Sequence, residues 1–441
     1  MATKRNIGAA LPQPQISTIT IANTWAAADT VSVTINNKVV TMTCGSTMDT
    51  TAEVAAGLRE VLGISTHDPA SISADCTTTH GGYEFAEFRD LTCTVSGSVV
   101  TCTSVGAIPF TMTASVTTAG SGTAAYAVAT AASGPNFFGG ATNYEGGVAP
   151  IADDTVVFDG ASASILYGLD TGLADLNITC TEDYAGDIGL PKINPRGYTE
   201  YRQRFLDAVI TATTGAQVAT LDGTGRRYID YKTTGDGSNT LAVTVLNSSA
   251  ASADGAAVQI VGGKRLVLTT YGGTVSVSDH LGESLTDILS VTNLGRTHIT
   301  LGSTATYVDG NDTIRNNTGT IELHSPMTGT SNEIFNYSGT MLIHVAANID
   351  AIYGYGGKVD MRCATCVLPI FYGGELDLTY CPVMTFSTGP LLFAGVTFRD
   401  PNNVNVNGSF SLNGCNPNDV KLHLKDNISY STSVAPSPAS H

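Results

Sequence analysis

The chain has 441 residues, with 47 glycines and only 13% charged residues, a composition that points away from ordinary enzymes. This length is enough for two or three domains. The formal net charge of −17 argues against a nucleic-acid partner, because phosphate binding needs clustered Lys and Arg. No run of about 18 apolar residues is present, so we expect no membrane insertion, and the N-terminus lacks an apolar signal core, so we expect no export by the usual route.

Residues 1–15 are expected to form an extended N-terminal arm. They contain a basic pair, Lys4 and Arg5, followed by Pro12 and Pro14. Such an arm either docks on another surface or frays in solution. In the first case Lys4 and Arg5 would anchor the chain on a neighbouring subunit, and in the second case they would belong to a solvated terminus.

Residues 16–132 are predicted to fold as a small α+β domain. Alternating apolar residues around a polar turn predict a hairpin, which comprises Val31, Val33, Ile35, Asn36, Asn37, Val39, Val40 and Met42. Thr50 and Glu53 have the spacing of a capping box. The apolar residues of one helix face follow, namely Val54, Leu58, Val61 and Leu62. Further hairpin strands are expected over 91–103 and 110–116. This plan resembles small domains repeated in tailed-phage tail and virion proteins, which implies a role in attachment.

A short linker, 133–135, leads into a run rich in asparagine, aromatic residues, glycine and aspartate. The run comprises Asn136, Phe137, Phe138, Asn143, Tyr144, Gly146, Gly147, Pro150, Asp153 and Asp154. It resembles the entry sequence that begins many β-helices in phage virion proteins and adhesins. The resemblance implies that Phe137, Phe138 and Tyr144 plug the open end of the first coil. Asp153 and Asp154 would belong to this cap or, as the less favoured alternative, bind a metal ion.

A second run supports the same resemblance. It consists of Ile188, Gly189, Leu190 and Pro191, followed by Tyr198, Thr199, Glu200, Tyr201, Arg202 and Leu206. Proteins of the same phage group carry a similar signature after the entry sequence. The likeness covers roughly residues 136–400, and it indicates a lineage without indicating a role.

Glycines recur through the second half of the chain. Each is predicted to open a short strand, and they are Gly273, Gly295, Gly319, Gly339, Gly357, Gly374 and Gly389. The spacings between neighbours are 22, 24, 20, 18, 17 and 15 residues, so we expect coils that shorten toward the C-terminus. Glycine suits such bends because it tolerates positive φ and lets neighbouring backbones approach. A repeat of this kind predicts a solenoid.

After most of these glycines, apolar and polar residues alternate with the period of a strand that has one buried face. The predicted inward residues are Ile321, Leu323, Met341, Ile343, Val345, Val359, Met361, Cys363, Leu376, Leu378, Leu391 and Phe393. Stacked coils would bury these faces in one continuous core. We therefore predict a mainly β fold, with a right-handed parallel β-helix over 133–425 and a flexible C-terminal tail over 426–441.

Nine cysteines are scattered along the chain. Cys93 and Cys102 flank a predicted hairpin and could form a disulfide under oxidising conditions. Cys363 and Cys366 form a CxxC motif, for which buried thiols and a metal or redox site both stay open. We favour buried thiols and assign no metal or cofactor, because a second ligand pair at the usual spacing is lacking.

Three carboxylates are the candidate catalytic residues. Glu322, Asp360 and Asp377 stand three positions after their glycines, so stacking would place them in one outward column with coils about 4.8 Å apart. Two carboxyl groups on neighbouring coils can cleave a polysaccharide if the pKa of one of them is raised, because that group can then act as the acid. The favoured alternative is a solvated face on which Lys358 and Arg362 compensate the carboxylates. Aromatic residues that could hold sugar rings are few on these faces, the eight histidines are dispersed, and the usual enzyme motifs are missing.

The resemblance to phage virion proteins, together with these features, implies a structural protein of a tailed-phage virion, without enzymatic activity and located at the virion surface. We expect a homotrimer, because three prisms can each bury one side around a closed axis. Its partners would be other virion proteins, either the major capsid protein or the tail. In the favoured case it decorates the capsid or forms a head fibre, attached through its N-terminal region. The alternative is a tail fibre or tailspike that binds or depolymerises a host surface glycan.

Overall fold

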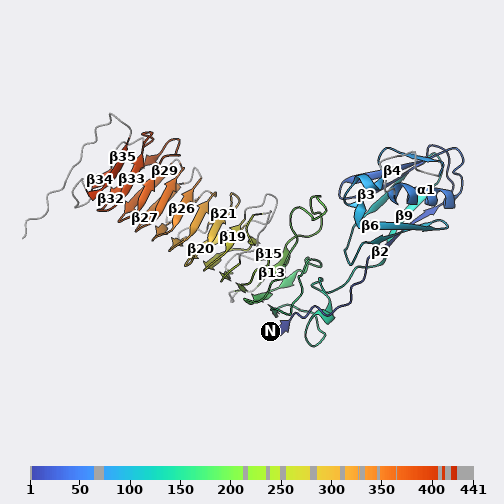
Figure 1. Cartoon of the computed structure of the whole chain (residues 1–441), viewed down its shortest axis with the longest axis horizontal. Coiled ribbons are helices and arrows are strands. Elements are labelled where there is room, and N and C mark those ends of the chain that lie inside the picture. Colours follow the sequence, from blue (N-terminus) through green and yellow to red (C-terminus); the bar gives the residue numbers. More distant parts are fainter. Residues whose placement is uncertain are drawn as a thin grey trace, which may run out of the picture.

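The computed structural model describes residues 2–63, 74–211, 217–234, 239–248, 255–278, 286–307, 313–325, 327, 333–344, 348–363, 365–405, 410–412 and 419–424. The chain is mainly β, with about 6% helix, and forms an N-terminal domain and a parallel β-solenoid of roughly ten turns (Figure 1). Val345, Cys415 and the predicted tail over 426–441 lie outside the described residues. Within those residues, no helix combines the length and apolar character needed to cross a bilayer.

The N-terminal domain contains eight described strands in two four-stranded antiparallel sheets, ordered β6-β7-β2-β9 and β5-β4-β3-β8. The strands are β2 (Ile16–Ala22), β3 (Thr30–Ile35), β4 (Lys38–Cys44), β5 (Cys76–Thr78), β6 (Leu91–Ser96), β7 (Val99–Ser104), β8 (Thr113–Thr117) and β9 (Thr123–Thr130). The predicted hairpin is present between β3 and β4. Asn36 and Asn37 have positive φ, 45° and 59°, as a tight two-residue turn requires.

The helix α1 (Thr51–Gly63) packs against these strands, beside the short 3-10 helices η2 (Gly82–Glu84) and η3 (Phe88–Asp90). The capping box is confirmed. The backbone N–H of Glu53 donates to Oγ1 of Thr50 (3.3 Å), and the backbone N–H of Thr50 donates to Oε2 of Glu53 (3.0 Å). The apolar face predicted for the helix is buried. Because the described domain is mostly strand, the α+β arrangement is not confirmed.

Two long parallel sheets form the solenoid, and successive strands mostly alternate between them. The 15-stranded sheet contains β1 (Thr3–Arg5), β10 (Thr155–Phe158), β12 (Asn177–Cys180), β14 (Gln217–Leu221), β16 (Leu241–Val245), β18 (Leu266–Thr270), β20 (Asp287–Asn293), β22 (Thr306–Tyr307), β23 (Thr313–Asn316), β25 (Glu333–Asn336), β27 (Asn348–Gly354), β29 (Thr365–Phe371), β31 (Thr385–Phe386), β32 (Leu391–Leu392) and β34 (Ser411–Leu412). The 12-stranded sheet contains β11 (Leu173–Ala174), β13 (Leu206–Ile210), β15 (Arg227–Thr233), β17 (Val258–Gly262), β19 (Thr274–Val277), β21 (His298–Leu301), β24 (Thr320–Leu323), β26 (Thr340–Ile343), β28 (Lys358–Met361), β30 (Glu375–Asp377), β33 (Thr397–Asp400) and β35 (Lys421–Leu424). Apolar side chains of both sheets meet in one core, so the predicted solenoid is confirmed.

Six of the seven predicted repeat glycines lie at the bend that leads into the 12-stranded sheet. Gly319 and Gly357 have positive φ, 79° and 66°. A Cβ on Gly357 would lie only 2.1 Å from the carbonyl oxygen of Gly339 on the preceding coil. Backbone conformation and close approach therefore both require glycine there. The described inward residues that were predicted for these coils are fully buried.

Gly389 does not belong to this series. It precedes β32 of the larger sheet, whereas the next strand of the 12-stranded sheet, β33, follows Gly395, whose φ is 87°. Consequently Leu392 is the buried residue of β32, and the inward assignment of Leu391 and Phe393 is wrong. Register partners at the strand starts from β19 to β35 are 24, 22, 20, 18, 17, 22 and 24 residues apart. The coils therefore shorten and then lengthen again.

A ladder of buried asparagines lies beside these bends. Asn293, Asn316 and Asn336 occupy the same register position on successive coils and are fully buried. The side-chain amide of Asn293 donates to Oδ1 of Asn316 (3.1 Å), and that of Asn316 donates to Oδ1 of Asn336 (3.2 Å). Each amide also donates to backbone carbonyls at the bend, including that of Thr340. The ladder thus provides hydrogen bonds where the sheet pattern stops.

Replacing Asn316 with alanine should destabilise the solenoid by about 2 kcal/mol, because buried acceptors of Asn336 and Thr340 would lose their donor. Asn317→Ala, at the adjacent half-buried position, is the matched control and should change the unfolding free energy by less than about 0.5 kcal/mol. Urea unfolding followed by circular dichroism measures both effects. Equal unfolding midpoints for the two variants would contradict a stabilising ladder.

The N-terminal arm lies on the solenoid of its own chain. The strand β1 pairs in parallel with β10 and forms the first strand of the 15-stranded sheet. Arg5 forms an ion pair with Asp159 (2.5 Å), and the backbone N–H of Ala2 donates to Oδ1 of Asp154 (2.8 Å). The N-terminal domain is therefore inserted between the first two strands of this sheet. Anchoring of a neighbouring subunit through Lys4 and Arg5 stays a prediction.

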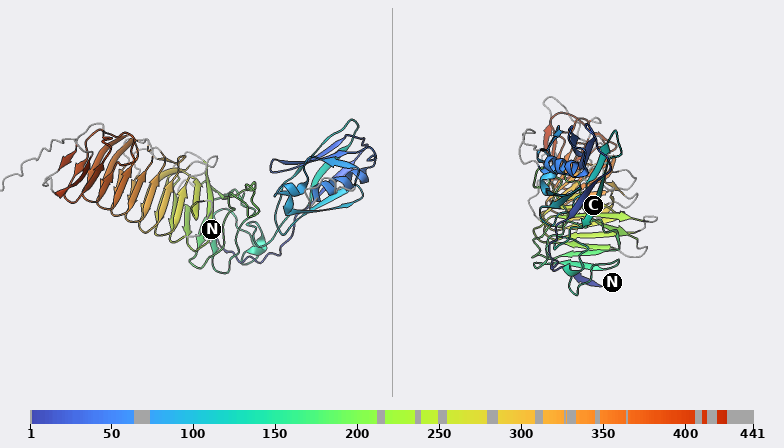
Figure 2. Two further views of the ribbon diagram at one scale, coloured as in Figure 1. Left: turned by 45° about the horizontal axis from the view of Figure 1, so that its top comes forward. Right: turned by 90° about the vertical axis from the view of Figure 1, so that its right-hand side faces the viewer.

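A loop of the solenoid, residues 190–204, holds the N-terminal domain close to the first coils (Figure 2). We call it the latch loop. The hydroxyl of Tyr198 donates to Oδ2 of Asp90 in the domain (2.7 Å). Within the loop, Arg202 and Glu200 form a buried ion pair with an Nε–Oε1 distance of 2.7 Å, and Arg202 also donates to a backbone carbonyl of the domain. Part of the second run noted in the sequence thus connects the two parts of the molecule.

The latch loop should weaken in acid. Burial raises the pKa of Glu200, but the hydrogen bonds and charge of Arg202 outweigh it, so the pKa is lowered overall. Such a carboxylate stabilises the fold above its unfolded pKa of about 4.5, and this stabilisation is lost as the pH falls through the lower folded value.

We therefore expect Glu200→Gln to lower the melting temperature at pH near 7 and to reduce its dependence on pH below about 4.5. Glu182→Gln, at an exposed position, is the control and should behave as the unaltered chain. Calorimetric scans over a pH series measure the slope. A Glu200→Gln variant with an unchanged slope would contradict the stabilising role of this pair.

Candidate functional site

The outer face of the 12-stranded sheet carries the carboxylates predicted from the sequence. The register pairs Glu322 with Leu342, Leu342 with Asp360, and Asp360 with Asp377. The three carboxylates do share a column, but Leu342 interrupts it. Asp360 and Asp377 lie on neighbouring coils, whereas Glu322 lies two coils from Asp360 and belongs to a different group of side chains.

Asp360 and Asp377 are each held by a cation. Arg362 donates to both oxygens of Asp360, each at 3.1 Å, and Nζ of Lys358 lies 2.5 Å from Oδ2 of Asp377. Burial raises the pKa of Asp377, but hydrogen bonds from Lys358 and Thr379 outweigh it, so the pKa is lowered overall. A general acid needs a raised pKa, and the lowered pKa of Asp377 does not meet that requirement. The arrangement is that of a charge-compensated face.

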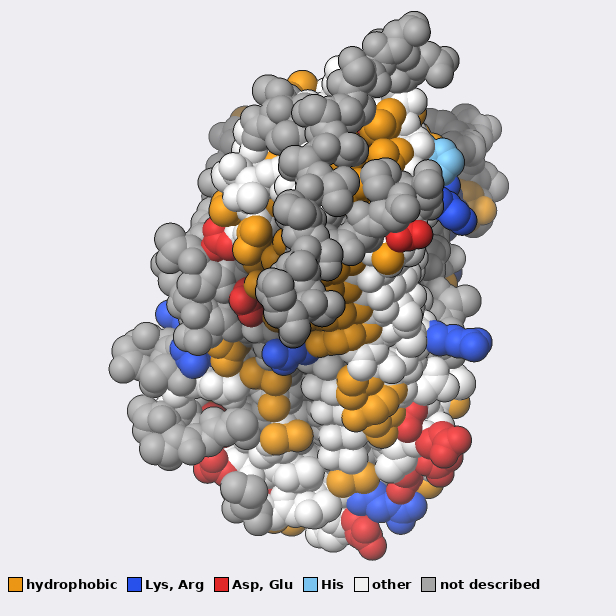
Figure 3. All heavy atoms as spheres, turned by 90° about the vertical axis from the view of Figure 1, so that its left-hand side faces the viewer, with side chains coloured by type: hydrophobic (Ala, Val, Ile, Leu, Met, Phe, Trp, Pro, Cys, Tyr) orange, Lys and Arg blue, Asp and Glu red, His pale blue; other side chains and the backbone are white. Residues whose placement is uncertain are grey.

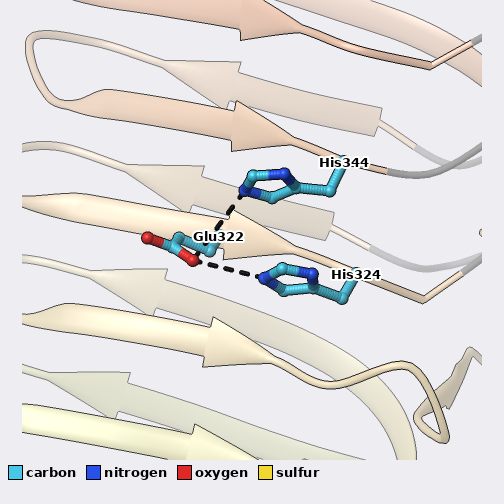
Figure 4. A group of neighbouring side chains, drawn as sticks. All are labelled: Glu322, His324 and His344. Carbon is cyan, nitrogen blue, oxygen red and sulfur yellow. Dashed lines mark hydrogen bonds and ion pairs between the residues drawn. The ribbon is translucent and has the colours of Figure 1, made fainter.

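Glu322 lies beside His324 and His344, which come from two neighbouring coils (Figure 4), and His298 of a third coil also approaches it. It belongs to β24, while His324 directly follows β24 and His344 directly follows β26 on the next coil. Oε2 of Glu322 lies 3.2 Å from Nε2 of His324 and 3.8 Å from Nε2 of His344. Oε1 lies 3.1 Å from Nε2 of His298, at the start of β21 on the preceding coil. We call these four residues the histidine–glutamate cluster.

The imidazoles of His324 and His344 stack on each other. Their centroids are 4.3 Å apart and their planes differ by 6°, because the residues preceding them pair in register on β24 and β26. Burial, together with the charges of His324 and Arg362, lowers the pKa of His344. Nε2 of His344 is buried and has no hydrogen-bond partner. The cluster therefore presents a ring nitrogen without a hydrogen-bond partner on the side of the carboxylate.

Among the described residues, one group of three or more side chains could hold a metal ion. Its members are Glu322, His324 and His344, whose ligand atoms all lie within 4.8 Å of one another. The view of the histidines as dispersed is therefore wrong for this part of the chain. The signal that could have found the group is an offset, since His324 and His344 each stand five positions after Gly319 and Gly339. Because the coils stack in register, residues at equal offsets from their glycines come into contact.

The predicted cap residues lie at the first coils. Phe138 and Tyr144 are buried in the solenoid core with their rings 6.1 Å apart, and the hydroxyl of Tyr144 donates to the carbonyl of Phe138 (2.8 Å). Phe137 is half-buried and packs on Tyr167 at 5.2 Å. That these rings plug the open end of the first coil stays a prediction. Asp154 accepts hydrogen bonds from two backbone N–H groups, which is a structural use of this carboxylate.

The cysteine pairs differ in their surroundings. Cys93 and Cys102 face each other across β6 and β7, with their sulfur atoms 3.2 Å apart. Cys363 and Cys366 are buried in the solenoid core, and burial raises the pKa of Cys363 to about 12. Because the thiolate is the form that binds metals and reacts, this environment supports the interpretation as buried thiols.

Mild oxidation should join Cys93 to Cys102, because their sulfur atoms have to approach from 3.2 Å to a bond length of about 2.05 Å with little backbone movement. Peptide mapping of the folded protein by mass spectrometry without reductant should detect this link. Cys363 and Cys366 should stay reduced in the same sample. A Cys93→Ser variant gives the baseline, and links among the core cysteines with Cys93 still free would contradict the prediction.

Exposed tyrosines form a ladder at the bend between the two sheets. Tyr337, Tyr355 and Tyr372 stack with centroids 5.1 Å apart, and Phe393 continues the ladder at 4.6 Å. Seen from the C-terminal end, charged side chains lie in small separate groups among hydrophobic and uncharged ones (Figure 3). Aromatic residues therefore gather at this bend, although few were expected on the sheet faces. Because each ring covers the next, a sugar ring could stack only on the ends of the ladder.

No family model, curated protein or solved structure matches the chain. The resemblance to phage virion proteins consequently depends only on the residues quoted for it, and the function has to be argued from the geometry.

Proposed function

We propose that the protein is a non-enzymatic structural protein of a tailed-phage virion, in which the solenoid is a right-handed shaft and the N-terminal region is the attachment module. The observation that carries the proposal is the architecture, an elongated solenoid with a separate domain latched to its first coils (Figure 2). Continuous stacking of coils gives such a body one long core and few places to bend. The right-handed sense follows the strong preference of parallel crossover connections.

The charge distribution supports a non-enzymatic role. Asp360 forms an ion pair with Arg362, and Asp377 forms one with Lys358, so each carboxylate has a cation as its partner. Acid–base cleavage of a glycan requires one carboxyl group that stays protonated near neutral pH. The lowered pKa of Asp377 is the opposite of this requirement.

We place the protein on the virion surface as a homotrimer that decorates the capsid or forms a head fibre. Among the described strands, β1 is the end of the 15-stranded sheet, so its outer edge is open to pairing with a strand of another chain. The arm that carries Lys4 and Arg5 would then contact the major capsid protein or a neighbouring subunit. The small size of the N-terminal domain favours this location.

The alternative is a tail fibre or tailspike that recognises a host surface glycan. The observation that favours it is the tyrosine ladder, in which Tyr337, Tyr355 and Tyr372 are 41%, 44% and 44% exposed on consecutive coils. Exposed aromatic residues in a row are unusual on an inert surface, and the rings at the ends of this row are open to stacking by a sugar.

The proposal is tested by mixing the purified protein with phage heads that lack it and, separately, with tails and with host cells, and then pelleting each mixture. We expect binding to heads at a fixed copy number per capsid and a trimeric mass in light scattering. Binding to cells or tails, with heads left bare, would overturn the decoration role in favour of glycan recognition.

A paired variant separates the structural reading from the enzymatic one. Asp360→Asn combined with Asp377→Asn should leave particle binding unchanged and release no sugar from host polysaccharide, as should the unaltered chain. A melting scan controls for loss of the two ion pairs. Depolymerisation by the unaltered chain that the paired variant lacks would establish the spike reading.

A further inference from the structure

We propose that Glu322, His324 and His344 bind a divalent transition-metal ion that links the coils of β24 and β26. The site is independent of the virion role proposed above, because it depends only on side chains of neighbouring coils. No other described group of side chains offers three ligand atoms this close together.

The distances from the carboxylate to both ring nitrogens are close to those of a metal site. Bonds of about 2.0–2.2 Å to zinc place tetrahedral ligand atoms about 3.3–3.6 Å apart. Oε2 of Glu322 is 3.2 Å from Nε2 of His324 and 3.8 Å from Nε2 of His344. These separations lie on either side of the ideal value. Both imidazoles would also have to turn toward the ion out of their parallel stack, in which the ring centroids are 4.3 Å apart, because a ring nitrogen binds a metal ion in the plane of its ring.

The orphan nitrogen of His344 is the second observation that points to a ligand. Nε2 of His344 is buried, has no hydrogen-bond partner and lies on the side of Glu322. An unpaired buried polar atom is costly unless something binds it. A metal ion would bind this nitrogen and supply the partner that it lacks.

The ligand set selects the class of metal. Two imidazoles and one carboxylate suit zinc and the neighbouring divalent ions from iron to copper, whereas calcium and magnesium prefer oxygen ligands only. The side chains of Glu322, His324 and His344 are 23%, 35% and 24% exposed. Solvent can therefore reach the site, and water would complete the coordination.

Two neighbours adjust the site without binding the ion. His298 lies 3.1 Å from Oε1 of Glu322, so it can donate to that oxygen and orient the carboxylate with Oε2 toward the metal. Arg362 is the cation that follows His344 in the same column, one coil further on. Its two hydrogen bonds to Asp360 compensate its charge, so it does not leave an unpaired positive charge beside the metal.

Equilibrium dialysis of the full chain against micromolar ZnCl₂, followed by elemental analysis, tests the proposal. We expect about one tightly bound zinc ion per chain and a melting temperature that rises with zinc concentration but not with calcium. The double variant His324→Ala, His344→Ala should lose this ion and the temperature shift. His423→Ala, which removes an exposed histidine from β35 of the same sheet, should keep both.

Single variants assign the roles within the cluster. His298→Ala should weaken zinc binding by about 10–100-fold, as expected for a residue that orients a ligand. Glu322→Gln preserves the shape and should weaken it more. Circular dichroism of each variant verifies that the solenoid is folded. Equal zinc binding by the unaltered chain and the double variant, no binding by the unaltered chain, or full binding by Glu322→Gln would each overturn the proposal.

Discussion

Stacking of parallel strands is the constraint on which the rest of this molecule depends. One coil has two short strands whose backbone groups and apolar faces are satisfied only by the coils on either side. The bends have to follow the same rule, because a bend that holds two coils apart would break both sheets. Gly357 meets this requirement because it has no side chain and lets two coils approach closely. The amide ladder meets it by supplying hydrogen bonds between the coils, from Asn293 to Asn316 and from Asn316 to Asn336.

The same stacking decides what the surface can do. Side chains at one offset from the bend meet their equivalents about 4.8 Å away on the next coil, so every exposed position becomes part of a row. Like charges in such a row are unfavourable, and Asp360 and Asp377 are tolerated because cations bind each of them. Rings in a row are favourable, as in the tyrosine ladder. The histidine–glutamate cluster is the place where a row offers metal ligands.

Much of this could be predicted from local patterns. Alternation after Gly319, Gly339, Gly357 and Gly374 identified the strands and their buried residues, because a period of two is a local property. Gly389 misled the assignment because glycine followed by proline also opens a strand of the other sheet, and the sequence does not say which sheet a strand joins. The histidine–glutamate cluster was missed for a related reason.

Contacts between coils depend on register, which the lengths of the intervening loops conceal. His324 and His344 are twenty residues apart, and only the equal offset from two glycines relates them. The place of the arm could not be predicted either, because pairing of β1 with β10 joins residues about 150 positions apart with no shared pattern. The capping box of α1, in contrast, lies within four residues and was found directly.

The insertion of the N-terminal domain between β1 and β10 gives the molecule two covalent connections where most domain pairs have one. The outgoing and returning segments also hydrogen-bond to each other, since Gln13 and Ser133 exchange backbone bonds of 2.8 and 3.1 Å. A single linker allows a domain to swivel freely, but a paired ribbon resists torsion and divides tension between two strands. Force applied at the far end of the solenoid would therefore be transmitted to the domain as a torque, whereas a single flexible linker would not transmit it.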